Sequence, residues 1–445
     1  GIPAEPLFRS IIPFLILGPF LPDLIVSVSS LFFLCYSLKN NNFYYFKIVP
    51  FIIFLLFCII ITLLSLESKD ISLSIKSSLF YFRIGVFSCF IWYLIDKDKN
   101  ILNYFYYALV LCFSVLVVDG YFQYFTGVNI SGFKIYSIRV SSFFGDELIM
   151  GSYLSRLFPL LFALFLVKQK KKYETYFIGL LFILIDVLIF MSGERTAFFF
   201  LNLSTIFIVI LIKEYQKFRL VTFIIAMICI FVLSLNSSKL SERMFENPAK
   251  NMGLIKNSSD KDKGFIKKSN ELIIFTPEHD SLIRTAYNMF KDQPILGHGP
   301  KMFRKLCKDK KYAVGKVPCS THPHNFYIQL LAETGIIGFL FLFSILGYVL
   351  YSALRQFKSI IFKQKRPLTD YQVCLLAGIL ITSWPFSPNG NFFNNWIMIV
   401  YSLPIGFYFQ SIYSKKKIIF LKKLYYNQNC FNSNFYIQID LYYYT

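Results

Sequence analysis

Long apolar runs recur along this chain of 445 residues and constrain its fold more than any other feature. A helix that crosses a bilayer needs about 20 mostly apolar residues. The first two candidate runs are interrupted by Pro19, Pro22 and Asp23, so they form either a helical hairpin or one kinked helix. Twelve stretches qualify, near residues 9–21, 23–38, 48–66, 78–95, 101–118, 148–167, 175–191, 197–212, 220–235, 326–351, 370–386 and 396–413. The sequence therefore predicts an all-α polytopic membrane protein with about 12 transmembrane helices.

The basic residues give the orientation of these helices. The chain carries a formal net charge of +21, which in another context would indicate a nucleic-acid partner. If the N-terminus is cytoplasmic, however, the inner loops and the inner tail to residue 424 hold 21 Lys and Arg, and the short outer loops hold five. Loops on the cytoplasmic side are enriched in Lys and Arg. We therefore expect both termini inside, multi-pass insertion in a membrane, membrane lipid as a partner, and no nucleic acid.

The same topology divides the chain into four parts. We expect nine helices in residues 1–235, a periplasmic subdomain in 236–324, three helices and a basic cytoplasmic end in 325–424, and a tail in 425–445 for which the sequence predicts no fold. We call residues 236–324 the outer segment; it holds 17 basic and 9 acidic residues. Residues 250–270 are poor in apolar side chains and are typical of a linker. Thr276 and Pro277 then predict a helix over 277–291.

The outer segment also concentrates cysteine and histidine. Cys307 and Cys319 are the only two of the nine cysteines that lie in it, and an oxidising compartment favours their pairing as a disulfide. All four histidines lie there too. Imidazole is the side chain best suited to moving a proton near neutral pH. Among the histidines, His279 and His298 also fit helix-start and turn positions, whereas His322 and His324 stand where the chain re-enters the membrane. The last two are therefore the stronger candidates for a site.

Ionisable residues inside predicted helices need partners or a polar cavity, because the bilayer disfavours charge. The candidates are Arg83, Arg156, Asp186 and Glu333. Internal ion pairs, for example of Asp186 or Glu333 with either arginine, and a role in substrate binding are both open. No C-x-x-C or H-E-x-x-H spacing occurs, so we expect no metal site and no cofactor.

Two further arginines flank the predicted membrane mouth. Arg195 follows Glu194, but neighbouring residues on a helix do not face each other, so Arg195 is available for a ligand. A guanidinium that keeps its charge and can bind two oxygens at once suits an anionic headgroup such as a diphosphate. Arg284 lies four residues after Asp280, and from spacing alone a surface ion pair explains it equally well.

Three blocks of residues resemble the O-antigen ligase and polymerase superfamily of bacterial membrane glycosyltransferases. The third block is the most specific, and the order of the blocks and the long outer segment are also similar to that family. The blocks are Ser192-Gly193-Glu194-Arg195-Thr196-Ala197; Arg284 followed by Asp292-Gln293-Pro294-Ile295-Leu296-Gly297-His298-Gly299; and His324-Asn325-Phe326-Tyr327 continuing through Leu330-Leu331-Ala332-Glu333-Thr334-Gly335-Ile336-Ile337-Gly338.

This resemblance implies a fold and a reaction. The fold would be that of the C-class glycosyltransferases (GT-C), with short helices in the periplasmic loop. The enzyme would take a glycan from an undecaprenyl-diphosphate donor and join it, without a metal, to a sugar hydroxyl on the periplasmic face. By the resemblance, Arg195 and Arg284 bind the donor diphosphate, and His324 activates the acceptor. We add His322, Arg156 and Arg83 to the substrate-binding set, with His322 as a neighbour that orients the site.

Several functions remain open at this point. A ligase would use lipid A core as acceptor, a polymerase would extend another lipid-linked glycan, and related enzymes glycosylate protein. We favour the ligase because the third block and the single long outer segment are most similar to it. A flippase or transporter of lipid-linked glycan would also place arginines in the bundle, although it has little use for a histidine-bearing outer segment. A structural scaffold would not need charges inside the membrane.

Overall fold

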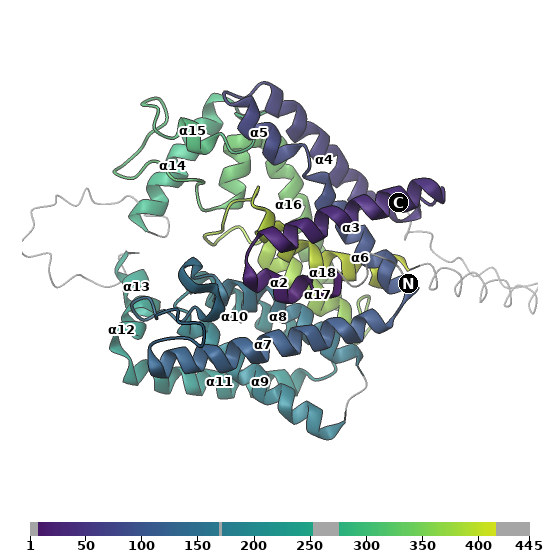
Figure 1. The fold of residues 1–445 in the computed structure, drawn as a ribbon, viewed down its shortest axis with the longest axis vertical. Coiled ribbons are helices and arrows are strands. Elements are labelled where there is room, and N and C mark those ends of the chain that lie inside the picture. Colours follow the sequence, from purple (N-terminus) through teal and green to yellow (C-terminus); the bar gives the residue numbers. More distant parts are fainter. Residues whose placement is uncertain (1–7, 169–170, 252–275, 415–445) are drawn as a thin grey trace, which may run out of the picture.

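The computed structural model describes residues 8–168, 171–251 and 276–414 (Figure 1). Within these ranges the regular elements are helices, apart from isolated β-bridges in the loop before residue 140. Most of the linker predicted for 250–270, the end of the basic segment at 415–424 and the tail at 425–445 lie outside the described residues.

Nine stretches of the described chain are long and apolar enough to cross a membrane. They are α3 (Phe20–Lys39), α4 (Val49–Leu66), α5 with α6 (Ile71–Ser78 and Phe82–Lys97), α7 (Asn100–Thr126), α8 (Met150–Val167), α9 (Lys172–Met191), α11 (Gln216–Asn236), α16 (Phe326–Ile361) and α18 (Asn395–Tyr413). Two further apolar helices are shorter, α10 (Arg195–Leu211) and α17 (Asp370–Thr382). The chain is thus a multi-pass helical membrane protein, as predicted.

The first of the twelve predicted spans is wrong. In its place lies α2 (Ile11–Leu17), a helix of seven residues. At 1.5 Å per residue such a helix is about 10 Å long, far short of the bilayer core. Gly18, at φ 131°, ends it before α3 begins. The break at the Pro19 and Pro22 region therefore separates a short buried helix from one span, rather than two spans.

The helices pack around a buried centre. Helix α6 packs against α18 and α3, and α8 packs against α17 and α10. Both α6 and α8 are buried along most of their length, whereas α4, α11 and α16 leave many apolar side chains exposed. Apolar exposure of this extent on helices of spanning length is what contact with lipid requires.

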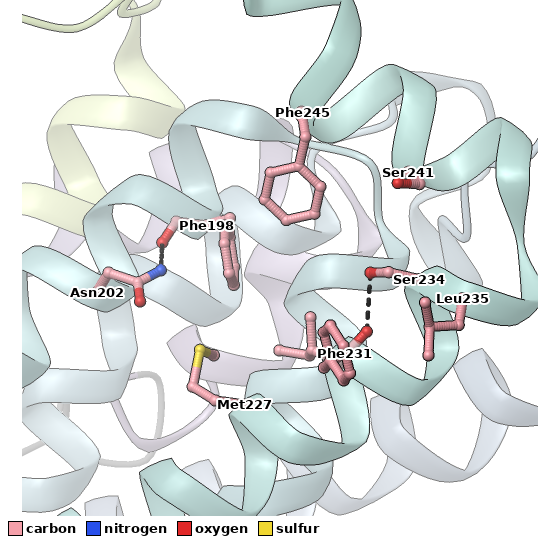
Figure 2. A pocket seen from close by; sticks show the side chains of 9 residues that line it. Phe198, Asn202, Met227, Phe231, Ser234, Leu235, Ser241 and Phe245 are labelled. Atoms are coloured by element: carbon pink, nitrogen blue, oxygen red, sulfur yellow. Dashed lines mark hydrogen bonds between the residues drawn. The ribbon is translucent and has the colours of Figure 1, made fainter.

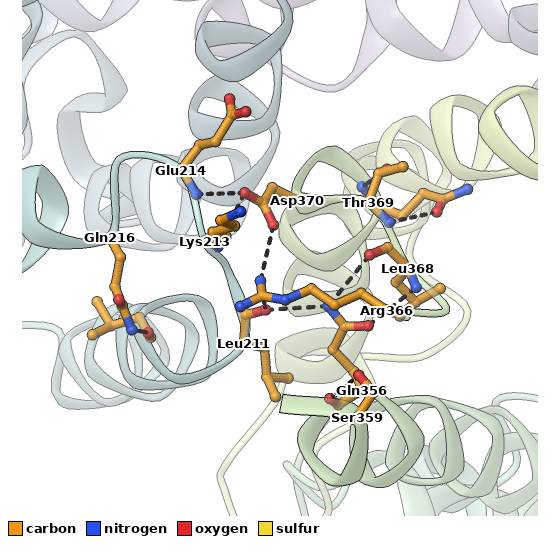
Figure 3. A network of polar contacts seen from close by, with 12 residues as sticks. Leu211, Lys213, Glu214, Gln216, Gln356, Ser359, Arg366, Leu368, Thr369 and Asp370 are labelled. Atoms are coloured by element: carbon orange, nitrogen blue, oxygen red, sulfur yellow. Dashed lines mark hydrogen bonds and ion pairs between the residues drawn. The ribbon is translucent and has the colours of Figure 1, made fainter. Parts of the chain in front are cut away.

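A polar network closes the end of α10 opposite Arg195 (Figure 3). The Asp370 carboxylate at the start of α17 accepts hydrogen bonds from the backbone N–H groups of Lys213 (3.0 Å) and Glu214 (2.6 Å). From α16, the Gln356 amide donates to the Leu211 carbonyl at 3.2 Å. The carbonyl and N–H groups left over where α10 ends are thereby satisfied by neighbouring helices.

The described part of the outer segment forms two groups (Figure 1). The first group, α12 (Ser238–Ser241), the π-helical turn η3 (Glu242–Glu246) and α13 (Asn247–Asn251), follows the end of α11. The second group, α14 (Pro277–Asp292) and α15 (Phe303–Leu306), packs on α16. Leu282, Met289 and Phe303 form a small core of its own together with Ala332 of α16. Cys307 and Cys319 are joined as a disulfide. The predicted helix over 277–291 is confirmed as α14, and its cap is the Thr276 side chain, which accepts from the His279 N–H.

The loop after α14 and a kink in α16 are joined through their backbones. Gly335 has φ 63° and ψ −160°, and its departure from helical geometry leaves backbone groups of α16 open to outside partners. The loop takes up these groups with three bonds: His298 N–H to the Ala332 carbonyl (3.1 Å), Gly299 N–H to the Glu333 carbonyl (2.8 Å), and Ile336 N–H to the Pro294 carbonyl (2.9 Å). The second and third sequence blocks are therefore two halves of one contact.

The glycines in these blocks permit the close approach. A Cβ on Gly335 would lie 2.2 Å from the Ile295 carbonyl oxygen, and a Cβ on Gly297 would lie 2.5 Å from the Glu333 carbonyl carbon. Both residues also have positive φ, which favours glycine. The contact thus fixes α14, and with it Arg284, relative to α16.

Gly335→Ala is expected to destabilise the protein by at least about 2 kcal/mol, because the new Cβ meets backbone and φ is positive. Gly347→Ala in the same helix is the matched control, since a Cβ there meets no atom within 4 Å. Thermal unfolding in detergent, followed by circular dichroism, compares the two variants. Equal melting temperatures for both would contradict the contact.

Asp186 of α9 is paired with Arg219 of α11, not with Arg83 or Arg156 as considered above. The two Arg219–Asp186 hydrogen bonds are 2.8 and 3.2 Å long, and both side chains are fully buried. Arg219 also donates to the Thr205 hydroxyl of α10 at 2.6 Å. Three helices are thus tied together by one buried charge pair, in which both Nη groups of Arg219 are hydrogen-bonded and its buried Nε has no hydrogen-bond partner in the described part of the chain.

Arg219→Met is expected to destabilise the protein by about 3–5 kcal/mol, because it leaves Asp186 buried and unpaired. The double variant Asp186→Leu/Arg219→Met should lose less than the sum of the two single variants, because it removes both charges. A double-mutant cycle measured by thermal unfolding gives the coupling energy. Strict additivity would show that the two side chains do not act as a pair.

Candidate functional site

His324 is held in place by the residue that follows it. The Asn325 side chain caps α16 by accepting hydrogen bonds from the N–H groups of Tyr327 (3.0 Å) and Ile328 (3.1 Å). The same side chain donates to the Pro385 carbonyl at 2.7 Å, in the loop between α17 and α18. His324 itself has φ 56°, in the left-handed region, and its carbonyl accepts from the Asn389 N–H at 2.7 Å. The imidazole therefore stands on a backbone fixed at both sides.

Three of the four histidines come together at this point. The ring of His324 lies 4.1 Å from that of His322 and 5.4 Å from that of His279, measured between ring centroids. His279 belongs to the first turn of α14, whereas His322 and His324 directly precede α16. The cluster therefore joins the start of α14 to the start of α16. His298 is elsewhere, with its Nε2 at 3.0 Å from the Met289 carbonyl, and it anchors the loop after α14.

These imidazoles are neutral at physiological pH. Burial, and to a smaller extent the nearby His279, lowers the pKa of His324 to about 4. Burial and the neighbouring His324 lower the pKa of His322 to about 3. A neutral imidazole has a free nitrogen lone pair, so His324 can accept a proton. Among the described residues, no group of three His, Cys, Asp or Glu side chains is arranged to hold a metal ion.

The first sequence block forms a turn between α9 and α10. Glu194 accepts hydrogen bonds from the N–H groups of Gly151 (2.7 Å) and Ser152 (3.1 Å), and from the Ser152 hydroxyl. It thereby caps the N-terminus of α8, where its negative charge is favourable. A Cβ on Gly151 would lie 2.3 Å from the Ser192 hydroxyl, so glycine is required for this approach. Glu194 is thus occupied with α8 rather than with Arg195.

Two arginines that the sequence did not single out hold the same turn. The Arg139 Nε donates to the Ser192 carbonyl at 3.1 Å, and the Arg243 Nε donates to the Gly193 carbonyl at 3.0 Å. A Cβ on Gly193 would lie 3.0 Å from atoms of both arginines. Arg139 is one of two basic residues between the helices predicted at 101–118 and 148–167, so its position was a weak signal of a role. Arg243 is one of 17 basic residues in the outer segment, so nothing in the sequence singled it out.

Arg195, the first residue of α10, is exposed beside these two arginines. No hydrogen bond or ion pair of its side chain occurs among the described residues. The pKa of His279 is lowered, mainly by burial. The negative charge of Glu278 raises this pKa, and the positive charge of Arg195 lowers it. Arg195 therefore acts electrostatically on the histidine cluster, and the first and third blocks face one site.

Arg284 lies on α14 and forms an ion pair with Asp280 at 2.7 Å. Its side chain is 38% exposed, so this pair is accessible to solvent and to a competing anion. Spacing had predicted this partner. The role of Arg284 in binding a ligand therefore remains a prediction.

The two arginines predicted inside spans are both engaged. Arg83 of α6 forms an ion pair with Asp23 of α3 at 2.5 Å. This pair favours a structural role for Arg83, with a partner other than the predicted Asp186 or Glu333. Arg156 of α8 is buried, donates to the Tyr401 hydroxyl at 3.1 Å and lies 5.0 Å from the Phe200 ring. The Arg156 Nη1 also donates to the Ser152 carbonyl at 3.4 Å, one helical turn earlier in α8. Ser152 is the residue whose hydroxyl and N–H donate to Glu194.

Glu333 pairs with neither arginine. Its carboxylate accepts from the Phe303 N–H (3.0 Å) and the Gln329 amide (2.9 Å), and the side chain is fully buried. The glutamate of the third block therefore binds α15 to α16, and it supports the site rather than entering it.

The chain was also compared with known proteins. Residues 178–343 match the family model described as O-antigen ligase. No curated protein matches the chain. The matched region contains the turn at 192–195, helix α14 and the histidine cluster, whose geometry has just been described. This match supports the resemblance of residues 178–343 to the O-antigen ligase and polymerase superfamily.

Proposed function

We propose that the protein is a GT-C-type glycosyltransferase that moves a glycan from undecaprenyl diphosphate to a sugar hydroxyl of lipid A core. The reaction would take place without a metal on the periplasmic face of the bacterial inner membrane. The observation that supports this most is a histidine cluster within the region that matches the O-antigen ligase family. The neutral His324 has its ring 5.4 Å from that of His279, and the charge of the exposed Arg195 acts on His279.

In this proposal the arginines act on the leaving group. Arg195 and Arg284 bind the donor diphosphate through charge-assisted hydrogen bonds. When the bond between the anomeric carbon and the diphosphate oxygen breaks, the electron pair stays on the diphosphate. Two guanidinium groups at a partly dehydrated membrane surface stabilise that charge as it develops. Arg284 can exchange its partner Asp280 for the diphosphate, because the ion pair is exposed.

His324 acts on the acceptor. A sugar hydroxyl is too weakly acidic to attack unaided, and a base within hydrogen-bond reach lowers that barrier. The acceptor oxygen forms the new bond to the anomeric carbon while its proton passes to His324. A free-enzyme pKa of about 4 makes this imidazole a weak base. The negative charge of a bound diphosphate raises that pKa toward neutrality, so donor binding improves the base. Direct displacement inverts the anomeric configuration.

His324→Ala and Arg284→Ala are each expected to reduce glycan transfer by at least about 100-fold while leaving the fold intact, because general-base and charge stabilisation each contribute that much. Arg355→Gln, an exposed arginine of α16 far along the chain from the site, is the control. Reconstituted protein with lipid-linked glycan and lipid A core, and no ion gradient, gives the rate. Near-normal transfer in either site variant would refute its role.

The product separates the remaining alternatives. Long glycan on lipid A core indicates a ligase, and a longer lipid-linked glycan indicates a polymerase of the same superfamily. Movement of donor across the vesicle membrane without transfer would indicate a flippase and would overturn the proposal.

The pH dependence of kcat/KM is expected to reflect His324. The neutral imidazole is the active form, so kcat/KM should be flat above about pH 5 and fall as the pH decreases through about 4. The fall in kcat should occur at a higher pH, because the bound diphosphate raises the pKa. A profile in which both quantities fall at one pH would contradict the coupling between donor and base.

Unfolding at low pH must be measured in parallel. Because the folded-state pKa of His324 lies below its ordinary value of 6.5, the unfolded chain binds more protons between about pH 6.5 and 4. Stability from this group is complete above pH 6.5 and is lost as the pH falls toward 4. Circular dichroism at each pH shows whether the rate falls before the fold does.

A further inference from the structure

A pocket between α10 and α11 is lined by residues none of which is charged (Figure 2). Its polar side chains are bonded to their own helices. The Asn202 amide donates to the Phe198 carbonyl at 2.6 Å, and the Ser234 hydroxyl donates to the Ile230 carbonyl at 2.8 Å. This pocket therefore offers no group that recognises an anion. Positive charge without a matching anion is found instead beside the histidine cluster.

Arg304 of α15 is a half-buried cation of this kind. Its Nε is buried and has no hydrogen-bond partner among the residues that the structure describes, and its guanidinium forms no ion pair with them. The neighbouring Lys305, by contrast, pairs with Asp70 at 2.9 Å. A buried donor without an acceptor costs free energy. Arg304 thus differs from Arg83 and Arg219, whose guanidinium groups face carboxylates.

Glu333 does not supply the missing anion. Its carboxylate attracts Arg304 electrostatically, but it accepts its hydrogen bonds from the Phe303 N–H and the Gln329 amide. Lys301 lies in the same region. Burial lowers the pKa of Lys301 most, the positive charge of Arg304 lowers it further, and Glu333 raises it. Two cations therefore stand close enough to repel each other, and the one carboxylate beside them is bonded elsewhere.

The disulfide places Arg304 beside His322. Cys307 follows Arg304 by three residues, Cys319 precedes His322 by three, and the Cα atoms of the two cysteines are 5.0 Å apart. Burial and His324 are the larger causes of the low pKa of His322, and the positive charge of Arg304 also lowers it. The rings of His322 and His324 are 4.1 Å apart. Arg304 is thus a neighbour of the histidine cluster.

Two arginines act on different histidines of the cluster. The charge of Arg195 acts on His279, and that of Arg304 acts on His322, while His324 has ring contacts with both histidines. In a direct displacement the attacking oxygen approaches the anomeric carbon from the side opposite the leaving group. With the diphosphate at Arg195, as proposed above, Arg304 is the arginine left for the acceptor.

We propose that Arg304, with Lys301 near it, binds a phosphate group carried by the acceptor and so brings the acceptor hydroxyl to His324. The inference rests on the proposed function, and it adds the chemical class of the acceptor, a phosphorylated glycan. A guanidinium binds two oxygens of a phosphate at once. A phosphate monoester carries up to two negative charges, so it matches two cations better than a carboxylate does.

Binding of acceptor to the full-length protein in nanodiscs, measured without donor, tests this inference. The two acceptors are lipid A core with phosphate on its core sugars and the same molecule without that phosphate. The wild-type protein is expected to bind the phosphorylated acceptor at least about tenfold more tightly, because charge-assisted hydrogen bonds are lost with the phosphate. This comparison needs no variant, so it does not depend on whether a substitution disturbs the fold.

The variants then assign the preference to a residue. Arg304→Gln should abolish the preference for the phosphorylated acceptor, and Arg304→Lys, which keeps the charge but not the fork, should retain part of it. Lys308→Gln is the matched control, since it removes one positive charge from an exposed side chain four residues further on. In the transfer assay, Arg304→Gln should raise the KM for the phosphorylated acceptor and leave the KM for the donor unchanged.

Equal binding of both acceptors by the wild-type protein would overturn the inference, and so would an Arg304→Gln variant that keeps the preference. Weaker binding of undecaprenyl diphosphate by Arg304→Gln, with acceptor binding unaltered, would assign Arg304 to the donor and would also overturn it. Failure of the proposed function looks different: the acceptors would bind as expected, and no glycan would be transferred to either.

Discussion

The backbone contact between the loop after α14 and the kink of α16 determines where the site residues stand. Helix α14 carries Arg284 and His279, and the chain that leads into α16 carries His324. These side chains can face one site only if the two helices are fixed relative to each other. Three backbone hydrogen bonds and two glycines provide that connection, and Glu333 strengthens it from within by accepting from the Phe303 N–H. A contact made of backbone has no flexible side chain that could relax, so it transmits position accurately.

The turn at 192–195 has an equivalent role on the other side of the site. It is held by Glu194 on α8, by Arg139 from the preceding loop and by Arg243 from η3. Three segments that are distant in sequence therefore determine where α10 begins, and Arg195 is its first residue. Ser192, Gly193 and Glu194 serve this framework, while Arg195 alone of the block faces outward. A short motif can thus combine structural residues with one residue that is available to a ligand.

How much the sequence could predict depended on the range of the interactions. Helix α14 was predicted correctly because its signals, Thr276 and Pro277 at the start and apolar residues at helical spacing, are local. The first span failed because hydrophobicity does not reveal that Gly18 ends a helix of seven residues. Arg219 falls between the helices predicted at 197–212 and 220–235, yet α11 begins at Gln216 and turns Arg219 inward to Asp186. Such pairs, like the attachment of Arg139 and Arg243 to one turn, are tertiary contacts that periodicity cannot show.

The distribution of satisfied charges gives a physical reason to look for function at the mouth of the bundle. Within the helices, Asp186 is matched by Arg219, Arg83 by Asp23, and Glu333 by an amide and a backbone N–H. A buried charge without such partners costs several kcal/mol, so the fold compensates charge wherever it has no other use for it. At the turn between α9 and α10, positive charge exceeds negative charge. Arg139, Arg195 and Arg243 are gathered there; Glu194 attracts Arg139, while the three arginines repel one another. In the proposed function, the negative charge of the donor headgroup reduces the repulsion at this turn, which favours its binding there.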